Sequence, residues 1–113
     1  MVTRSRVDMT LCDYLIDITV NDNGDGTVSV SIESDCDNVQ EYARRLTAVD
    51  VEELTRLDGT AIIRTADEAG LTPTCLVPMA VLNACWLEMG LISKTFAATK
   101  PPLSIEFPDD GTY

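Results

Sequence analysis

The sequence predicts an α+β fold, in which three to four helices pack on one face of an antiparallel sheet of about three strands. Over the first third of the chain, apolar and polar residues alternate, which is typical of strands with one buried face. After residue 37, apolar residues recur at the helical spacing of three and four. Strands followed by helices, in that order, are typical of helices layered on one sheet.

The strongest strand signals lie at 14–21 and 27–33, and we expect these two segments to form a hairpin. Their alternating patterns place one apolar set on a single face: Tyr14, Ile16, Ile18 and Val20 in the first, and Val28, Val30 and Ile32 in the second. The intervening "DNGDG" contains glycines that accept positive φ, as tight turns require. A shorter strand at about 5–9 is expected to pair with this hairpin.

A helix is predicted directly after the hairpin, because Val39, Tyr42, Ala43 and Leu46 fall at helical spacing. Asp37 is the expected N-cap, and Gln40 is expected to complete a capping box. A short helix is expected at 50–57, where Asp50 can cap and two glutamates suit the first turn. Another helix is expected at 60–69, ending before Gly70.

The last predicted helix has the strongest signal and covers 78–89. It begins at Pro78, which suits a first helical turn, and ends at Met89, directly before Gly90. Its expected apolar stripe consists of Leu82, Cys85, Trp86 and Met89. After "TKPP", the segment "LSIEF" at 103–107 is expected to form a short edge strand, and 108–113 to form a flexible tail. The 113 residues are expected to form a single domain.

The amino-acid composition of the chain limits the kinds of partner that we expect it to bind. Apolar residues make up 45% of the chain, which favours a globular domain, and 19 acidic residues against 8 basic ones give a formal charge of −11. That charge repels phosphate backbones and anionic membranes, so we expect neither nucleic acid nor a membrane as partner. No apolar run is long enough for a signal peptide or a membrane span, so we expect a cytoplasmic protein.

Four cysteines and no histidine define the available chemistry. In a reducing compartment such cysteines are free, metal-bound or reactive rather than paired in disulfides. The absence of histidine excludes histidine-based acid–base catalysis and mixed Cys/His metal sites within this chain. The sequence therefore favours a binding protein over an enzyme.

Three of the cysteines lie where predicted elements meet. If Gly24 is the centre of the hairpin turn, Cys12 and Cys36 are equally distant from it and are expected to lie opposite or nearly opposite each other at the open end. Cys75 lies in the loop before the final helix. Their thiolates are soft ligands suited to an iron–sulfur cluster, zinc or copper(I). Cys85, on the predicted apolar stripe, is expected to be a packing residue.

The order of these segments resembles that of iron–sulfur scaffold proteins of the NifU type. The matching stretches are "LCDYLIDITV", "SIESDCDNVQEYARRL" and "LTPTCLVPMAVLNACW". The resemblance implies a cluster or zinc held by Cys12, Cys36 and Cys75, with Asp13 as the nearby acid that tunes cluster release. It also implies a sulfur donor or a cluster-accepting protein as partner. Scaffolds carry Cys-Gly-Asp where this chain has Cys12-Asp13-Tyr14.

The fourth ligand is open, and the candidates are Asp13, Asp35, Asp37, a partner's thiolate or a small molecule. The chain is also similar to a group of small archaeal proteins of unknown activity that share its "SDC" and C-x-V-P motifs, here Ser34–Cys36 and Cys75–Pro78. Two other functions stay open. One is a non-catalytic interaction domain with structural cysteines, and the other is a persulfide acceptor in which Cys36 reacts because a helix start favours its thiolate.

Overall fold

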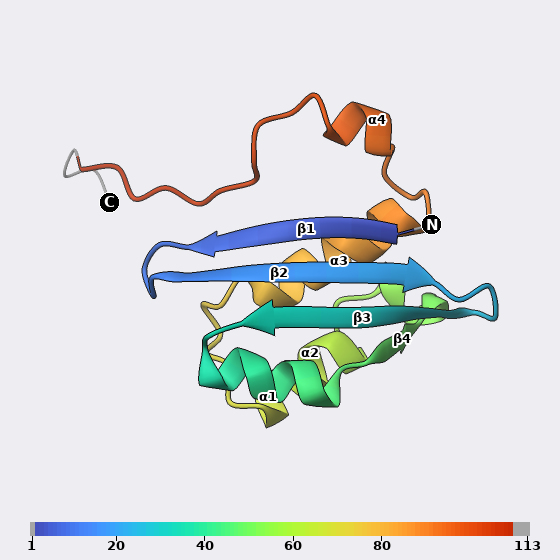
Figure 1. Ribbon diagram of the computed structural model, residues 1–113, viewed down its shortest axis with the longest axis horizontal. Helices are drawn as coiled ribbons and strands as arrows, with labels where there is room; N and C mark the ends of the chain where they lie inside the picture. The colour runs from blue at the N-terminus through green and yellow to red at the C-terminus, as the bar shows by residue number, and fades with distance from the viewer. Residues whose placement is uncertain (1, 110–113) are drawn as a thin grey trace.

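The computed structural model describes residues 2–109 and confirms the α+β fold (Figure 1). Its sheet contains β1 (Val2–Met9), β2 (Tyr14–Asp22), β3 (Thr27–Ser34) and β4 (Ala48–Asp50), which are adjacent in chain order and pair antiparallel throughout. The sheet thus has one strand more than predicted. Only Val49 of β4 is buried, and three residues are too few to show an alternating pattern.

The alternation in the first three strands produces a sheet with two different faces. Side chains facing the helices are buried: Val7, Met9, Ile16, Ile18, Val20, Val28, Val30 and Ile32. The opposite face carries exposed polar residues such as Arg4, Asp17 and Ser31. The helices therefore pack on one face only, because only that face offers apolar surface to cover.

The hairpin turn is centred one residue later than predicted. Asp22 pairs with Val28, so the centre is Asp25 rather than Gly24, and every expected pair shifts by two residues. Asp22 Oδ1 accepts from the Gly24 N–H at 2.9 Å, and Asp25 Oδ1 accepts from the Thr27 N–H at 3.0 Å. These side-chain bonds shape the turn. A shift of two residues preserves the predicted faces, but it means that Cys12 and Cys36 are not opposite each other.

The helices follow the predicted order, with differences at their ends. They are α1 (Asp37–Arg45), the 3₁₀ helix η1 (Val51–Thr55), α2 (Ala61–Glu68), α3 (Val77–Glu88) and α4 (Lys94–Ala97), the last of which was not predicted. The expected capping box of α1 is wrong. Cys36 is the N-cap, Asp37 already belongs to the helix, and the Gln40 side chain donates to the Ser34 carbonyl at 2.9 Å. Thr60 caps α2, its hydroxyl accepting from the Ile63 N–H at 3.3 Å.

The α3 helix lies across β1 and β2 and forms the centre of the core. The expected stripe is wrong in part, because Leu82, Trp86 and Met89 are only partly buried. The buried face consists of Val77, Pro78, Val81, Ala84, Cys85 and Glu88. Because α3 is apolar on nearly every side, its sequence pattern does not indicate which side faces the sheet.

Glu88 is a buried acid on this core face, and it joins three separate elements. Its carboxylate accepts from Thr3 Oγ1 at 2.7 Å, from the Asp22 N–H at 2.9 Å and from Lys94 Nζ at 3.1 Å. These bonds fasten the end of α3 to β1, to the end of β2 and to α4. Tyr42 makes a similar link between α1 and α2, since its buried hydroxyl donates to the Ile62 carbonyl at 2.9 Å.

The segment 103–107 does not form the predicted strand. It is extended, pairs with no described residue and exposes all three of its apolar side chains, at 85% for Leu103 and 65% each for Ile105 and Phe107. Of the predicted tail at 108–113, only Pro108 and Asp109 are among the described residues, and both are exposed. No helix within residues 2–109 is long and apolar enough to span a bilayer.

Candidate functional site

The cysteines Cys12, Cys36 and Cys75 all lie at one end of the sheet. Cys12 is in the turn between β1 and β2, Cys36 immediately precedes α1, and Cys75 lies in the loop before α3. In Figure 1 this turn and the starts of both helices are together at the left-hand end of the molecule. The fold therefore brings together three thiols that are far apart in the sequence. We call this group the thiol cluster.

Each thiol is positioned by hydrogen bonds of its own backbone. The Cys12 N–H donates to the Met9 carbonyl at 3.1 Å and closes the turn. The Cys36 N–H donates to Ser34 Oγ at 3.1 Å, and the Cys75 N–H donates to the Thr72 carbonyl at 3.0 Å. Cys12 is exposed, whereas Cys36 and Cys75 are partly buried. The cluster is therefore open to solvent on the side of Cys12.

The Cys36 and Cys12 sulfurs affect the pKa of the Cys75 thiol. Burial raises its pKa most, the N–H of Val77 partly opposes this by hydrogen bonding to the sulfur, and the negative charges of Cys36 and Cys12 raise the pKa further. The Cys36 and Cys12 sulfurs are thus near enough to Cys75 for a negative charge on either to oppose its ionisation. Without a cation among them, the Cys75 thiol keeps its proton at neutral pH.

The ligand set for a metal is not preassembled. Among residues 2–109, no three histidine, cysteine or acidic side chains already lie close enough together to hold a metal ion. The acids nearest in sequence to the thiols, Asp13, Asp35 and Asp37, are all exposed. Asp13 adopts a φ of 60°, the left-handed conformation that glycine prefers and aspartate tolerates.

Cys85 does not belong to the thiol cluster. It is fully buried within α3, and burial, followed by the charge of Glu88, raises its pKa to about 12. Its predicted role as a packing residue is confirmed.

Sequence reasoning missed how the cluster meets the core. Cys36 and Cys75 both pack against the buried core to which Tyr42 belongs. Burial raises the pKa of Tyr42 most, and the charges of Cys75 and Cys85 raise it further. Nothing in the sequence signals this proximity, because 33 residues separate Tyr42 from Cys75.

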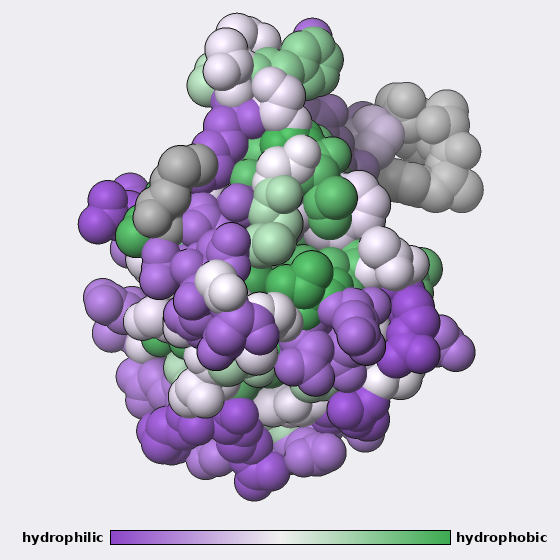
Figure 2. Space-filling model, turned by 90° about the vertical axis from the view of Figure 1, so that its right-hand side faces the viewer, coloured by the Kyte–Doolittle hydropathy of each residue, from purple (hydrophilic) through white to green (hydrophobic). Residues whose placement is uncertain are grey.

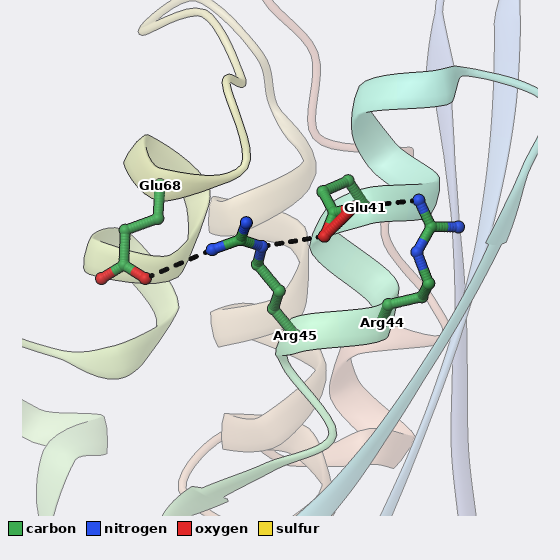
Figure 3. A network of polar contacts seen from close by, with 4 residues as sticks. All are labelled: Glu41, Arg44, Arg45 and Glu68. Atoms are coloured by element: carbon green, nitrogen blue, oxygen red, sulfur yellow. Dashed lines mark hydrogen bonds and ion pairs between the residues drawn. The ribbon is translucent and has the colours of Figure 1, made fainter.

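Two other polar features compete for a functional role and lack the needed chemistry. Glu41, Arg44, Arg45 and Glu68 form a network between α1 and α2 (Figure 3), in which the two positive and two negative charges balance. A depression of about 310 Å³ on the helix-free face of the sheet is spanned by the Arg6–Asp17 ion pair at 2.8 Å. The charges of the network are all paired, and so are Arg6 and Asp17 in the depression. Arg4 and Glu33 also line the depression without an ion pair among residues 2–109, but both are exposed, and neither is a buried group of the kind that reacts.

Contact between the sulfurs can be tested by alkylation. We expect the alkylation rate of Cys75 to rise at a higher pH in the folded chain than in the chain unfolded in urea. In Cys36→Ser this midpoint should move to lower pH, because one repelling charge is removed, while burial still keeps it above the unfolded value. Mass spectrometry of labelled peptides over a pH series measures the change, and Cys85→Ala is the control. If the pH midpoint of Cys75 alkylation is the same in Cys36→Ser as in Cys85→Ala, Cys36 and Cys75 do not interact.

A family model described as "Family of unknown function (DUF6951)" matches residues 3–100, a range that includes the whole thiol cluster. No curated protein and no solved structure matches the chain.

Proposed function

The chain belongs to this family of unknown function, and we propose that it is a small thiol-based binding or carrier protein, which holds zinc or an iron–sulfur cluster through Cys12, Cys36 and Cys75. The observation that carries the proposal is the gathering of three junction thiols at one end of the sheet. Thiolates are the preferred protein ligands of both kinds of cargo.

The electrostatics of the cluster favour a soft cation. Without a cation, burial raises the pKa of Cys75, and negative charge on Cys36 or Cys12 raises it further. A bound cation reverses this balance, because it stabilises each thiolate and the protons leave as it binds. Metal affinity should therefore increase with pH over the range in which the thiols ionise.

Binding requires the ligands to come closer together, and the exposed turn that carries Cys12 is the part expected to move. The described acids and thiols do not yet form a complete ligand set, and the Cys12 turn is the most exposed part of the site. The fourth ligand would come from Asp13, Asp35, Asp37 or a partner. The left-handed backbone at Asp13 supports the resemblance to scaffold proteins, since those carry glycine at the corresponding position.

The open position of Cys12 suits transfer rather than permanent storage. A cargo held in part by an exposed turn can be reached by a second protein, so a sulfur donor or a cluster-accepting protein is the expected partner. The alternative of a reactive persulfide acceptor at Cys36 has less support, because it rests on one thiol at a helix start, whereas the gathering of three thiols favours shared ligation. A non-catalytic interaction domain is the second candidate, favoured by the exposed apolar side chains at 103–107.

The direct test is metal binding by the full chain purified without oxygen. Iron, zinc and acid-labile sulfide are measured first, and the apo form is then titrated with Co²⁺. Thiolate ligation is expected to produce an intense sulfur-to-cobalt charge-transfer band that Zn²⁺ displaces. A folded chain with neither metal nor sulfide, and with no such band, would leave the interaction domain as the better description.

A further inference from the structure

One long edge of the sheet is unprotected. β1 is the first strand in the sheet order, so one side of its eight residues has no neighbouring strand among the described residues. It contains no proline or bulge, and such an edge offers its free N–H and C=O groups to any additional strand. The opposite edge, β4, is only three residues long.

The same chain carries an unpaired segment with the pattern of a strand. In Leu103, Ser104, Ile105, Glu106 and Phe107, apolar and polar residues alternate, and the apolar set is exposed as described above. Pro101 and Pro102 precede it and act as a stiff spacer. This segment therefore has a strand's sequence without the pairing that would bury one of its faces.

The segment and the edge match in both polarity and charge. If Leu103, Ile105 and Phe107 face the helix side, they extend the apolar layer beside Val7 and Met9. Ser104 and Glu106 then lie on the helix-free face, where β1 presents Arg4 and Arg6. Neither Arg4 nor Glu106 makes an ion pair within residues 2–109.

An exposed apolar surface continues from this edge towards α4. Lys94, the first residue of α4, and Thr3 of β1 both donate to the same oxygen of Glu88, which places α4 beside the start of β1. Leu91 and Phe96 are exposed in this region. Figure 2 shows hydrophobic side chains gathered below α4 and surrounded by hydrophilic ones. A strand added to β1 would lie next to this surface.

We propose that segment 103–107 of a second copy of this chain adds as a strand to the β1 edge, and that the exchange is reciprocal, forming a two-fold dimer. The chain's own segment is less suitable. In Figure 1 it runs in the same direction as β1, so pairing within one copy would be parallel in an otherwise antiparallel sheet. Parallel pairing is the less stable arrangement, whereas a second copy can approach antiparallel.

The first test is self-association of the full chain by sedimentation equilibrium. We expect a concentration-dependent dimer, and we expect Ile105→Asp to raise its dissociation constant by about 100-fold, because a charge would enter the apolar layer. Leu57→Asp is the matched control, since Leu57 is similarly exposed, at 70%, but lies in the loop before α2. A monomeric wild type, or equal effects of both variants, would overturn the proposal.

A charge exchange then identifies the edge and distinguishes a second copy from the chain's own segment. Arg4→Glu and Glu106→Arg should each weaken the dimer by about tenfold, because like charges then oppose each other at both symmetric contacts. Mixing the two variants should restore association, since every contact in the mixed dimer again joins opposite charges. A mixture no better than its components would exclude this edge as the acceptor. The result is independent of the thiol cluster and of any metal.

Discussion

Replacing Cys75 by serine is expected to weaken zinc or cobalt binding by about 100-fold or more. Structural zinc sites gain roughly 10 to 16 kcal/mol in total, so the loss of one of the three thiolates in a four-ligand site removes several kcal/mol. Cys75 is chosen because it is partly buried and because negative charge on Cys36 or Cys12 raises its pKa, which links it to both other thiols. Competition with a chromophoric chelator measures the affinity, and circular dichroism shows whether the variant is folded.

The matched control removes a different thiol. Cys85→Ala also lowers the number of cysteines by one, but Cys85 is sealed within the core and should leave metal affinity unchanged. Cys12→Ser and Cys36→Ser should resemble Cys75→Ser. If Cys85→Ala reduced affinity as much as the cluster variants, the loss would reflect damage to the fold, and the thiol cluster would not be the binding site.

Replacing Glu88 by alanine is expected to destabilise the fold by about 3 to 5 kcal/mol. The Glu88 side chain has no exposed surface, and its removal leaves Thr3 Oγ1 and the Asp22 N–H without an acceptor. Each unsatisfied buried donor costs roughly 1 to 3 kcal/mol. Urea unfolding measures the change, which corresponds to a fall in melting temperature on the order of 15 °C.

Glu52→Ala is the control for this substitution, because Glu52 is exposed and makes no hydrogen bond or ion pair among residues 2–109. We expect it to change the free energy of unfolding by less than about 0.5 kcal/mol. A Glu88→Ala variant as stable as Glu52→Ala would show that the carboxylate does not hold α3 against the strands.

The same carboxylate makes stability depend on pH. Burial alone would raise the pKa of Glu88, but the bonds from the Asp22 N–H, Thr3 and Lys94 outweigh it and lower the pKa below that of an ordinary glutamate. The stabilisation that the Glu88 carboxylate provides is therefore complete above the pKa that Glu88 has in the unfolded chain. It is lost as the pH falls through the lower pKa that Glu88 has in the folded chain. Urea unfolding at several pH values should show a smaller loss on acidification in Glu88→Gln than in the wild type.

The parts of the fold that could be predicted depend on neighbours in the chain. The alternation in β2 and β3 specified both strands and their buried faces, because each side chain's direction follows from its position along the strand. Gly70, which adopts a φ of 83°, marked the end of α2 through its own backbone preference. The hairpin centre was missed by one residue, because two aspartates bond to turn N–H groups that the glycine pattern does not reveal.

The sequence predicted which residues form the candidate site, but not how they are arranged. Cysteines at element junctions can be read along the chain, and the strands and helices place those junctions at the same end of the sheet. Their separations, and the partial burial of Cys36 and Cys75 against the core, depend on how α1 and α3 pack on the sheet. The sequence also suggested that Cys12 and Cys36 lie opposite or nearly opposite each other across the hairpin, and the observed register shifts them two residues out of line.

By itself, then, the sequence determined an α+β domain with a two-faced sheet, a buried final helix and thiols at three junctions, because local periodicity and capping act over a few residues. Only the tertiary structure decided which side of α3 faces the sheet, that Glu88 joins segments 66 and 85 residues away, and that both 103–107 and the β1 edge lack a pairing strand among the described residues. The physical reason is that these features depend on distant surfaces. A helix that is apolar on every side, an acid that needs three donors and a strand that needs a neighbour obtain their partners only when the whole chain has packed.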